Sequence, residues 1–468
     1  MRNDWDRVDA ETIEDLRDQI SINQSADPDS IRDLLKRNAK GAAIQCISNF
    51  ILAMNYDPKL WQLIRLNELT ERTDVTGNAF WIRDGVALTD TDKAYIKRYL
   101  EDTYSLTSEK TLENAIRIVA NEKRYHPIRD YLNTLQWDGE YRIRYVLHHF
   151  LGADTSDLTY ECMKMFLMGA LNRIFRKGCK FDYCLCLVGS QGIGKSTFFR
   201  FLALKDEWYT DDLKKLDDEN VYRKLQGHWI IEMGEMMATL NAKSVEEIKS
   251  FLSRMSDVYK VPYETQPKDR LRQCVFAGTT NTQRFLPFDR SGNRRFLPVQ
   301  TDKEQMEIHI PADEEHSRIY MDQVWAEAMT LYRNHDFSMK FTPEIEILLE
   351  EHLKEFMPED TKAGIIQAYL DDCTERYVCS RMIYEHAFHR EGCEPKGWEL
   401  REICDIMNRS ITGWRRVKQH RYSKYGVQHS WEREDPGSAV AGSQSDSSSD
   451  GDGFIPVPEQ MKIPFDEL

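Results

Sequence analysis

The sequence predicts an α/β protein in which a central parallel sheet is flanked by a mainly helical N-terminal domain and a C-terminal helical and winged-helix-like region. A chain of 468 residues, 41% of them hydrophobic, is long enough for about three domains. Between residues 181 and 300, short continuous apolar runs alternate with helical patterns, as expected of strands buried on both faces. On either side of this stretch, apolar residues recur at helical spacing.

The changes of pattern divide the chain into five segments. We expect a mainly helical domain (1–150), an α/β core (151–305), a helical region (306–395), a basic winged-helix-like module (396–434) and an acidic tail (435–468). The tail is rich in Ser, Gly and Asp, and it contains too little apolar surface to fold, so we predict that it is disordered.

Composition argues against several classes of protein. No apolar run is long enough to span a membrane and the first residues are charged, so we predict a cytoplasmic protein without membrane contact. The ten cysteines form no Cys-x-x-Cys pair, which predicts reduced thiols and no zinc site. The net charge of −15 disfavours DNA contact over the whole surface, so any such contact must come from local basic patches.

The strongest motif is a glycine-rich loop between the apolar run YCLCLV and the helical pattern TFFRFLA. It matches the P-loop pattern G-x-x-x-x-G-K-[ST]. Its residues are Gly189, Ser190, Gln191, Gly192, Ile193, Gly194, Lys195, Ser196 and Thr197. Backbone N–H groups of such a loop surround phosphate oxygens, its lysine contacts the β and γ phosphates, and its serine hydroxyl reaches Mg²⁺. The alternative is a chance glycine-rich turn.

A second apolar run, WII, is followed by two acids, Glu232 and Glu235. The end of a buried strand delivers carboxylates to the edge of the sheet where the phosphates lie. We assign Glu232 to the metal and Glu235 to the attacking water. The alternative is that both acids are solvated on an amphipathic segment.

Two further polar features follow the third apolar run, CVFAG. Asn281 ends the predicted strand CVFAGTTN, which begins with this run, and it could orient a water against the γ phosphate, although asparagine at this place is also a common turn former. Arg294 and Arg295 precede a short strand, and a guanidinium suits the charge that develops during phosphoryl transfer. The alternative for the pair is a solvated edge.

Two basic segments are candidates for contact with nucleic acid. Residues 256–273 suggest a hairpin with interleaved tyrosines. Its candidate contacts are Lys260, Lys268, Arg270 and Arg272. Residues 399–433 suggest a helix, a turn, a second helix and a two-stranded wing, with candidate contacts at Arg415, Arg416 and Lys418. Composition alone allows a solvated hairpin and a protein-docking module instead.

The order of these motifs within 189–295 resembles the virulence-associated E family, phage and genomic-island proteins that are similar to superfamily 3 helicases. The stretches that carry the resemblance are YHPIRDYLNTLQWDGEYRI, GCKFDYCLCLVGSQGIGKST, GHWIIEMGEM, KVPYE, GTTN and GNRRFLPV. Unlike the usual adjacent acidic pair, the two acids here are separated as Glu232 and Glu235. Many relatives carry a primase domain, but residues 1–150 show no primase signature, so we predict that this chain does not prime.

The resemblance implies an AAA+-like core that binds ATP and Mg²⁺ at Lys195, Ser196 and Glu232, and a sensor role for Asn281. It also implies that Arg294 or Arg295 acts on the nucleotide of a neighbouring subunit, in a hexameric ring around DNA. We therefore expect an ATP-dependent DNA helicase or translocase that serves replication of a phage or mobile element. Single-stranded DNA would pass through the pore, and duplex could bind the C-terminal module. The alternatives are a regulatory or remodelling ATPase and a small-molecule kinase.

Overall fold

The computed structural model describes residues 27–434 except for 214–215, 217–220, 235–241, 260–267 and 288–292. Contacts divide the chain after Pro358 into two compact units. The predicted disordered tail lies outside the described residues. Within the part of the chain that the structure describes, none of the helices combines the length and the apolar character needed to span a bilayer.

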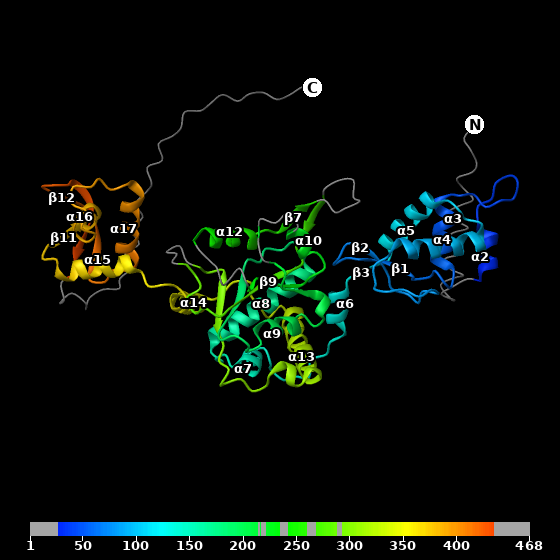
Figure 1. The fold of residues 1–468 in the computed structure, drawn as a ribbon, viewed down its shortest axis with the longest axis horizontal. Helices are drawn as coiled ribbons and strands as arrows, with labels where there is room; N and C mark the ends of the chain where they lie inside the picture. Colours follow the sequence, from blue (N-terminus) through cyan, green and yellow to red (C-terminus); the bar gives the residue numbers. More distant parts are fainter. Residues whose placement is uncertain are drawn as a thin grey trace, which may run out of the picture. The chain divides into compact units, whose positions relative to one another are not determined.

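The N-terminal part contains helices and a small sheet, which are blue to cyan in Figure 1. Its elements are α2 (Pro28–Leu34), α3 (Ile47–Tyr56), β1 (Ile64–Asn67), β2 (Arg72–Val75), α4 (Asp90–Tyr104), α5 (Glu109–Glu122) and β3 (Arg124–Tyr125). The strands form a sheet in the order β2-β1-β3. Helix α4 begins with a capping box, in which Thr89 and Asp92 each accept the other's backbone N–H.

This N-terminal part has a core of its own, which extends from Ile31 to Val119. Residues from Ile128 onward pack instead into the core of the central sheet. The predicted boundary at residue 150 is therefore too late. The three-stranded sheet was also missed, because strands of two to four residues show no clear alternation.

The central part contains the five-stranded sheet, green in Figure 1. The elements before and within the sheet are α6 (Pro127–Thr134), α7 (Val146–Leu151), α8 (Asp157–Phe175), β4 (Cys184–Val188), α9 (Lys195–Leu202), η1 (Asp206–Trp208), β5 (Tyr209–Thr210), α10 (Val221–Leu225), β6 (Ile230–Glu232), α12 (Ala242–Leu252), β7 (Ser256–Tyr259), β8 (Lys268–Leu271), β9 (Val275–Thr280) and β10 (Phe296–Gln300). Three further elements complete the unit: η2 (Ile310–Ala312), α13 (Glu314–Arg333) and α14 (Pro343–Glu355).

The sheet has the order β10-β4-β9-β6-β5, and every neighbouring pair is parallel. This confirms the predicted parallel sheet. All residues of β4, β6 and β9 are buried, which explains why these strands appear in the sequence as unbroken apolar runs. Because the strands are parallel, their carboxyl ends meet at one edge of the sheet. Helix α8 is buried on almost every side and packs against β4 and β9.

The second unit is smaller and contains α15 (Thr361–Asp372), β11 (Tyr377–Cys379), α16 (Ser380–His386), α17 (Gly397–Arg409), β12 (Trp414–Tyr422) and β13 (Gly426–Arg433). Its strands form an antiparallel sheet in the order β11-β13-β12. One core joins helix and sheet residues from Ile366 to Trp431. The chain thus divides at residue 358 and not at the predicted 395, since α15 and α16 share this core. Pro358 and the N-cap residue Asp360 separate α14 from α15, a signal in the sequence that our division of the chain did not use.

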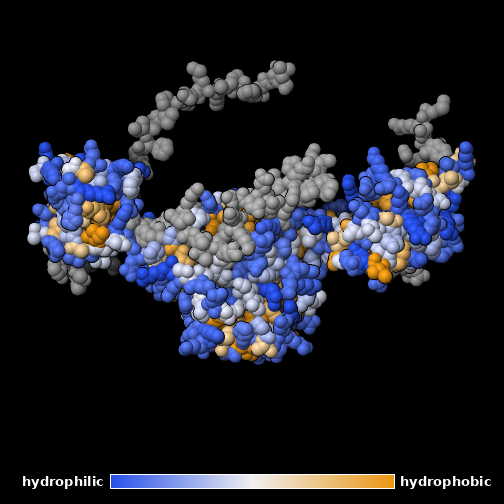
Figure 2. Space-filling view, in the orientation of Figure 1, coloured by the Kyte–Doolittle hydropathy of each residue, from blue (hydrophilic) through white to orange (hydrophobic). Residues whose placement is uncertain are grey.

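Most of the visible surface is hydrophilic, and hydrophobic residues form small separate patches (Figure 2). Among the described residues, the large hydrophobic side chain with the greatest exposure is Ile82, at 98%. Single exposed apolar residues are ordinary on protein surfaces. The cores of the two units therefore account for most of the apolar residues that the sequence patterns single out.

Candidate functional site

The loop 189–194 connects the end of β4 to the start of α9, as the sequence predicts. Gly194 has φ 101°, a left-handed conformation that favours glycine. A Cβ atom on Gly189 would lie 2.1 Å from the hydroxyl oxygen of Thr301, so no larger residue fits there. Ile193 is buried at 1% exposure and anchors the loop in the core. The core therefore fixes the loop on one side, and on the other side the loop backbone remains accessible to a ligand.

Lys195 is the first residue of α9, and its ammonium group is held by three oxygens. It donates to the carbonyl oxygens of Gly189 and Ser190, both at 2.8 Å, and to the side-chain oxygen of Asn281 at 2.9 Å. Burial lowers the pKa of this ammonium. All three acceptors are neutral, so among the described residues no carboxylate forms a hydrogen bond with this partly desolvated positive charge. Such an arrangement favours an anionic ligand.

Glu232 ends β6 and is buried at 3% exposure. Its Oε1 accepts hydrogen bonds from the hydroxyls of Ser196 (2.8 Å) and Thr279 (2.5 Å). Its Oε2 accepts from the Tyr209 hydroxyl at 2.6 Å. A carboxylate and a hydroxyl in contact at the edge of a sheet are the oxygen ligands that Mg²⁺ prefers. The residues present therefore fit this ion.

These groups face a hollow of about 780 Å³, a size within the range of small-molecule sites. It is lined by Gln191, Gly192, Gly194, Lys195, Ser196, Thr197, Asp211, Asp212, Glu232, Gly234, Thr279, Thr280, Asn281, His309 and Pro311. The structure thus brings most of the predicted loop residues together with Glu232 and Asn281. Glu235, to which we assigned the attacking water, lies outside the described residues.

Several residues of this hollow were not among the predicted site residues. Asp211 and Asp212 line the hollow directly after β5, a strand of two residues that has no recognisable period, and Tyr209 of that strand donates to Glu232. His309 and Pro311 belong to a segment without helical or strand spacing. Thr279 carries a signal that sequence reasoning can use, because a polar residue at the end of a buried parallel strand faces the same edge as Glu232.

The arginine pair lies at the other edge of the sheet. Arg294 and Arg295 precede β10, whose first residue pairs with Cys184 at the start of β4. The loop 189–194 follows the far end of β4, about 13 Å away at ~3.3 Å per residue. Arg295 forms an ion pair with Asp182 (2.9 Å), whereas Arg294 is exposed. Neither arginine is among the residues that line the hollow of its own chain.

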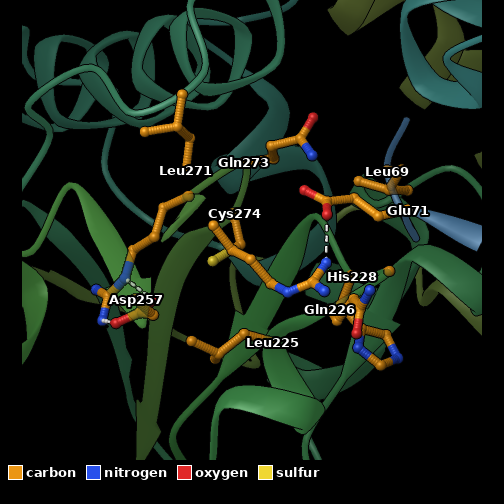
Figure 3. Close-up of a pocket in the computed structure, with 12 residues that line it drawn as sticks. Leu69, Glu71, Leu225, Gln226, His228, Asp257, Leu271, Gln273 and Cys274 are labelled. Atoms are coloured by element: carbon orange, nitrogen blue, oxygen red, sulfur yellow. Dashed lines mark hydrogen bonds and ion pairs between the residues drawn. The ribbon is translucent and has the colours of Figure 1, made fainter. Parts of the chain in front are cut away.

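The hairpin of β7 and β8 requires a correction. Arg270 and Arg272 were expected to contact DNA, but they are 6% and 3% exposed. Arg270 is paired with Glu71, and Arg272 binds Asp257 through two hydrogen bonds of 2.6 and 2.9 Å. Figure 3 shows Glu71 and Asp257 at the ends of these contacts, around a small pocket at the base of the hairpin. Both arginines therefore stabilise the base of the hairpin.

The other predicted hairpin contacts cannot be placed in the same way. Lys260 and the side chain of Lys268 lie outside the described residues. The turn between β1 and β2 also reaches this region, because the Gln273 side chain donates to the Glu68 carbonyl at 2.9 Å. Leu69, from the same turn, belongs to the core of the central sheet. The N-terminal part thus contacts the base of the hairpin.

In the second unit, Arg415, Arg416 and Lys418 are exposed along β12, an edge strand of its sheet. Arg415 is paired with Glu432 at 2.7 Å. Hydrogen bonds from Arg415, Tyr377 and Arg376 lower the pKa of Glu432 to about 2. Glu432 therefore neutralises part of the positive charge of β12 within the second unit.

The comparisons with known proteins agree with the motif order. Residues 132–358 match the family model described as the virulence-associated protein E-like domain. This segment belongs to the virulence-associated protein E-like family. The virulence-associated E-like domain covers the five-stranded sheet, the loop 189–194 and the whole of the hollow. It ends where the second unit begins.

Among solved structures, the A-form apo structure of the NrS-1 C-terminal region is similar with a TM-score of 0.45 and 12% identity, covering 79% of this chain and 96% of that one. Another apo structure of that region has a TM-score of 0.43 and 14% identity, covering 80% and 96%. Likeness at this level supports no residue-by-residue comparison. No curated protein is significantly similar to the chain.

Proposed function

We propose that the virulence-associated E-like domain binds and hydrolyses ATP with Mg²⁺. The observation that carries this proposal is the convergence of Lys195, Ser196, Glu232 and Asn281 on one hollow at the carboxyl edge of a parallel sheet. Phosphates bind at this place in α/β proteins, because a glycine loop and a helix N-terminus supply backbone N–H groups. The neutral partners of Lys195 leave its positive charge available to a phosphate.

Each residue has a distinct part in the proposed reaction. Lys195 exchanges its carbonyl and amide partners for the β and γ phosphates. Ser196 and Glu232 hold Mg²⁺, which when bound supplies charge stabilisation to the phosphoryl oxygens. Asn281 is released from Lys195 and can orient the attacking water. Glu235 remains our proposal for the group that activates this water.

The position of the arginine pair supports action between subunits. A side chain at the start of β10 lies at the edge of the sheet opposite the hollow of its own chain, so any nucleotide that it stabilises belongs to a neighbour. Arg294 is the better candidate, because Arg295 is already paired with Asp182. We therefore propose a ring, hexameric as the family resemblance implies, in which Arg294 completes the site of the adjacent subunit.

We further propose that ATP hydrolysis drives movement along DNA, as a helicase or translocase in the replication of a phage or mobile element. The exposed basic residues Arg416 and Lys418 of β12 support a DNA contact in the second unit. The order helix, strand, helix, helix, strand, strand in that unit supports a winged-helix module that binds duplex. Lys260 and Lys268 remain our candidates for contact with single-stranded DNA in the pore.

The experiment compares ATP hydrolysis by the full chain with and without single-stranded DNA, for the wild type and Lys195→Ala. Lys205→Ala is the control, since this exposed lysine follows α9 but does not line the hollow. We expect hydrolysis that DNA stimulates, that Lys195→Ala abolishes and that Lys205→Ala retains. Hydrolysis that survives Lys195→Ala contradicts the ATPase. Hydrolysis that depends on Lys195 but is not stimulated by DNA contradicts the helicase function and favours a regulatory or remodelling ATPase.

A further inference from the structure

The two oxygens of the Glu232 carboxylate have different surroundings. Oε1 faces Ser196 and Thr279, on the side where the proposed metal binds. Oε2 has one partner among the described hydrogen bonds, the hydroxyl of Tyr209 at 2.6 Å. A carboxylate can rotate about its last bond, and a fixed Oε2 restricts that rotation. Tyr209 therefore influences the direction in which Oε1 points.

The register of the sheet explains how Tyr209 reaches this place. Tyr209 pairs with Ile230 in the parallel pair of β5 and β6. Glu232 lies two residues farther along β6 and so shares the face of Ile230. Two positions along a strand span only about 7 Å, a distance that the long side chains of Tyr209 and Glu232 bridge with their hydrogen bond. The contact thus follows from the pairing of β5 with β6.

The Tyr209 hydroxyl is a permanent donor. Burial and the charge of Glu232 raise the pKa of this phenol well above its usual range, so it stays protonated at every working pH. Because this hydroxyl binds Oε2, it does not compete with a cation for Oε1, the oxygen that faces Ser196.

We propose that Tyr209 is a positioning residue, which holds the Glu232 carboxylate in the orientation that binds Mg²⁺ together with Ser196. This inference rests on the proposed function, because it requires a metal at Ser196 and Glu232. Groups that orient a metal ligand from behind commonly change metal affinity 10- to 100-fold when they are removed. The alternative is that the hydrogen bond only fastens the short strand β5 to β6.

The test uses the full chain and Tyr209→Phe, which keeps the ring and removes the hydroxyl. Tyr131→Phe is a matched control, because the Tyr131 hydroxyl also donates to a carboxylate, that of Asp322 at 2.8 Å. Tyr131 packs against the same core as Tyr209, but its partner Asp322 is not among the residues that line the hollow, whereas Glu232 is. A fluorescent ATP analogue reports binding in EDTA and during a titration with Mg²⁺. Thermal unfolding reports any loss of stability.

We expect Tyr209→Phe to raise about 10-fold the Mg²⁺ concentration that gives half of the full effect on binding of the ATP analogue. This is the lower end of the range for groups that orient a metal ligand. Binding in EDTA should be unchanged. Tyr131→Phe should leave both values unchanged. An unchanged Mg²⁺ requirement in Tyr209→Phe, or an equal change in both variants, overturns the positioning role. A wild-type chain that binds no nucleotide contradicts the proposed function itself, a result distinct from either.

Discussion

The side-chain oxygen of Asn281 accepts a hydrogen bond from the Lys195 ammonium, and the 2.9 Å between them joins the end of β9 to the first turn of α9. In the function that we propose, a phosphate replaces this amide as the partner of Lys195, so nucleotide binding would break the contact and release both groups. On that proposal, the strength of the contact affects nucleotide affinity, and the chemistry of the released Asn281 side chain affects turnover.

Asn281→Asp and Asn281→Ala should separate these effects. Asp places a carboxylate against Lys195, and the resulting ion pair competes with phosphate, so we expect nucleotide affinity to fall about 10-fold. Ala removes the contact, so binding should persist while kcat falls about 10²-fold, as for the loss of one oriented polar group in other active sites. Equilibrium binding and steady-state hydrolysis measure the two. Equal affinity in Asn281→Asp and wild type would contradict this account.

The arginine pair should divide into a functional and a structural member. Arg294→Ala should bind ATP normally and lose hydrolysis by about 10³-fold or more, the effect of removing an arginine finger. Arg295→Ala should mainly lower the melting temperature, because it leaves Asp182 without its ion-pair partner.

Mixing experiments test whether Arg294 acts on a neighbour. Arg294→Ala subunits keep their own loop and Lys195→Ala subunits keep their own arginine, so mixed oligomers contain some complete sites. Activity should reappear on mixing. If mixed oligomers form and stay inactive, Arg294 does not act between subunits.

Arg270→Ala should destabilise the protein. Removing one partner of a buried ion pair commonly costs about 3–5 kcal/mol, and Arg270 is 6% exposed against Glu71. Arg416→Ala, at an exposed position of β12, should leave the melting temperature unchanged and reduce the salt dependence of DNA binding. Thermal unfolding and DNA titrations at several salt concentrations measure both. A stable Arg270→Ala with weakened DNA binding would restore the original expectation for the hairpin.

His126 should make stability depend on pH. It caps α6 by accepting the backbone N–H of Arg129 at Nδ1, and its Nε2 donates to Gln273. Burial lowers the pKa of this imidazole from 6.5 to about 4, and the nearby positive charges of Arg129 and Lys177 act in the same direction. Protonation would also replace the capping acceptor by a donor.

Because the folded pKa is depressed, the unfolded chain takes up a proton first as the pH falls. The stabilisation is therefore full above pH 6.5 and is lost toward pH 4, by about 3 kcal/mol at most. His126→Asn keeps a capping oxygen and does not titrate. Its melting temperature should fall less between pH 7 and 4.5 than that of the wild type. Equal falls would contradict a role for His126.

The parallel sheet could be predicted because β4, β6 and β9 are buried on both faces, so their sequences are uninterrupted apolar runs. Polar residues at the ends of such runs share an edge, which is why Lys195, Glu232 and Asn281 could be grouped before their positions were known. Tyr209 could not be added to this group from the sequence, because its strand contains two residues and its contact with Glu232 depends on the register between β5 and β6.

The expectation for Arg270 and Arg272 was wrong because a count of charges does not show whether a side chain points outward or into the protein. Both arginines point inward, where Glu71 and Asp257 neutralise them, while Leu271 between them is 50% exposed. This reverses the usual pattern, in which the apolar residue is buried. Glu71 belongs to a turn about 200 positions earlier in the chain, and the sequence around Arg270 does not indicate so distant a partner.

The burial of α8 has a consequence for synthesis on the ribosome. The helix ends at Phe175, but β9, the later of the two strands against which it packs, is complete only at Thr280, about 105 residues later. At 5–20 residues per second, its apolar surface stays without these partners for roughly 5–21 s. We expect the nascent chain to need a chaperone during this interval, and slower translation of residues 176–280 to increase aggregation of the newly made protein.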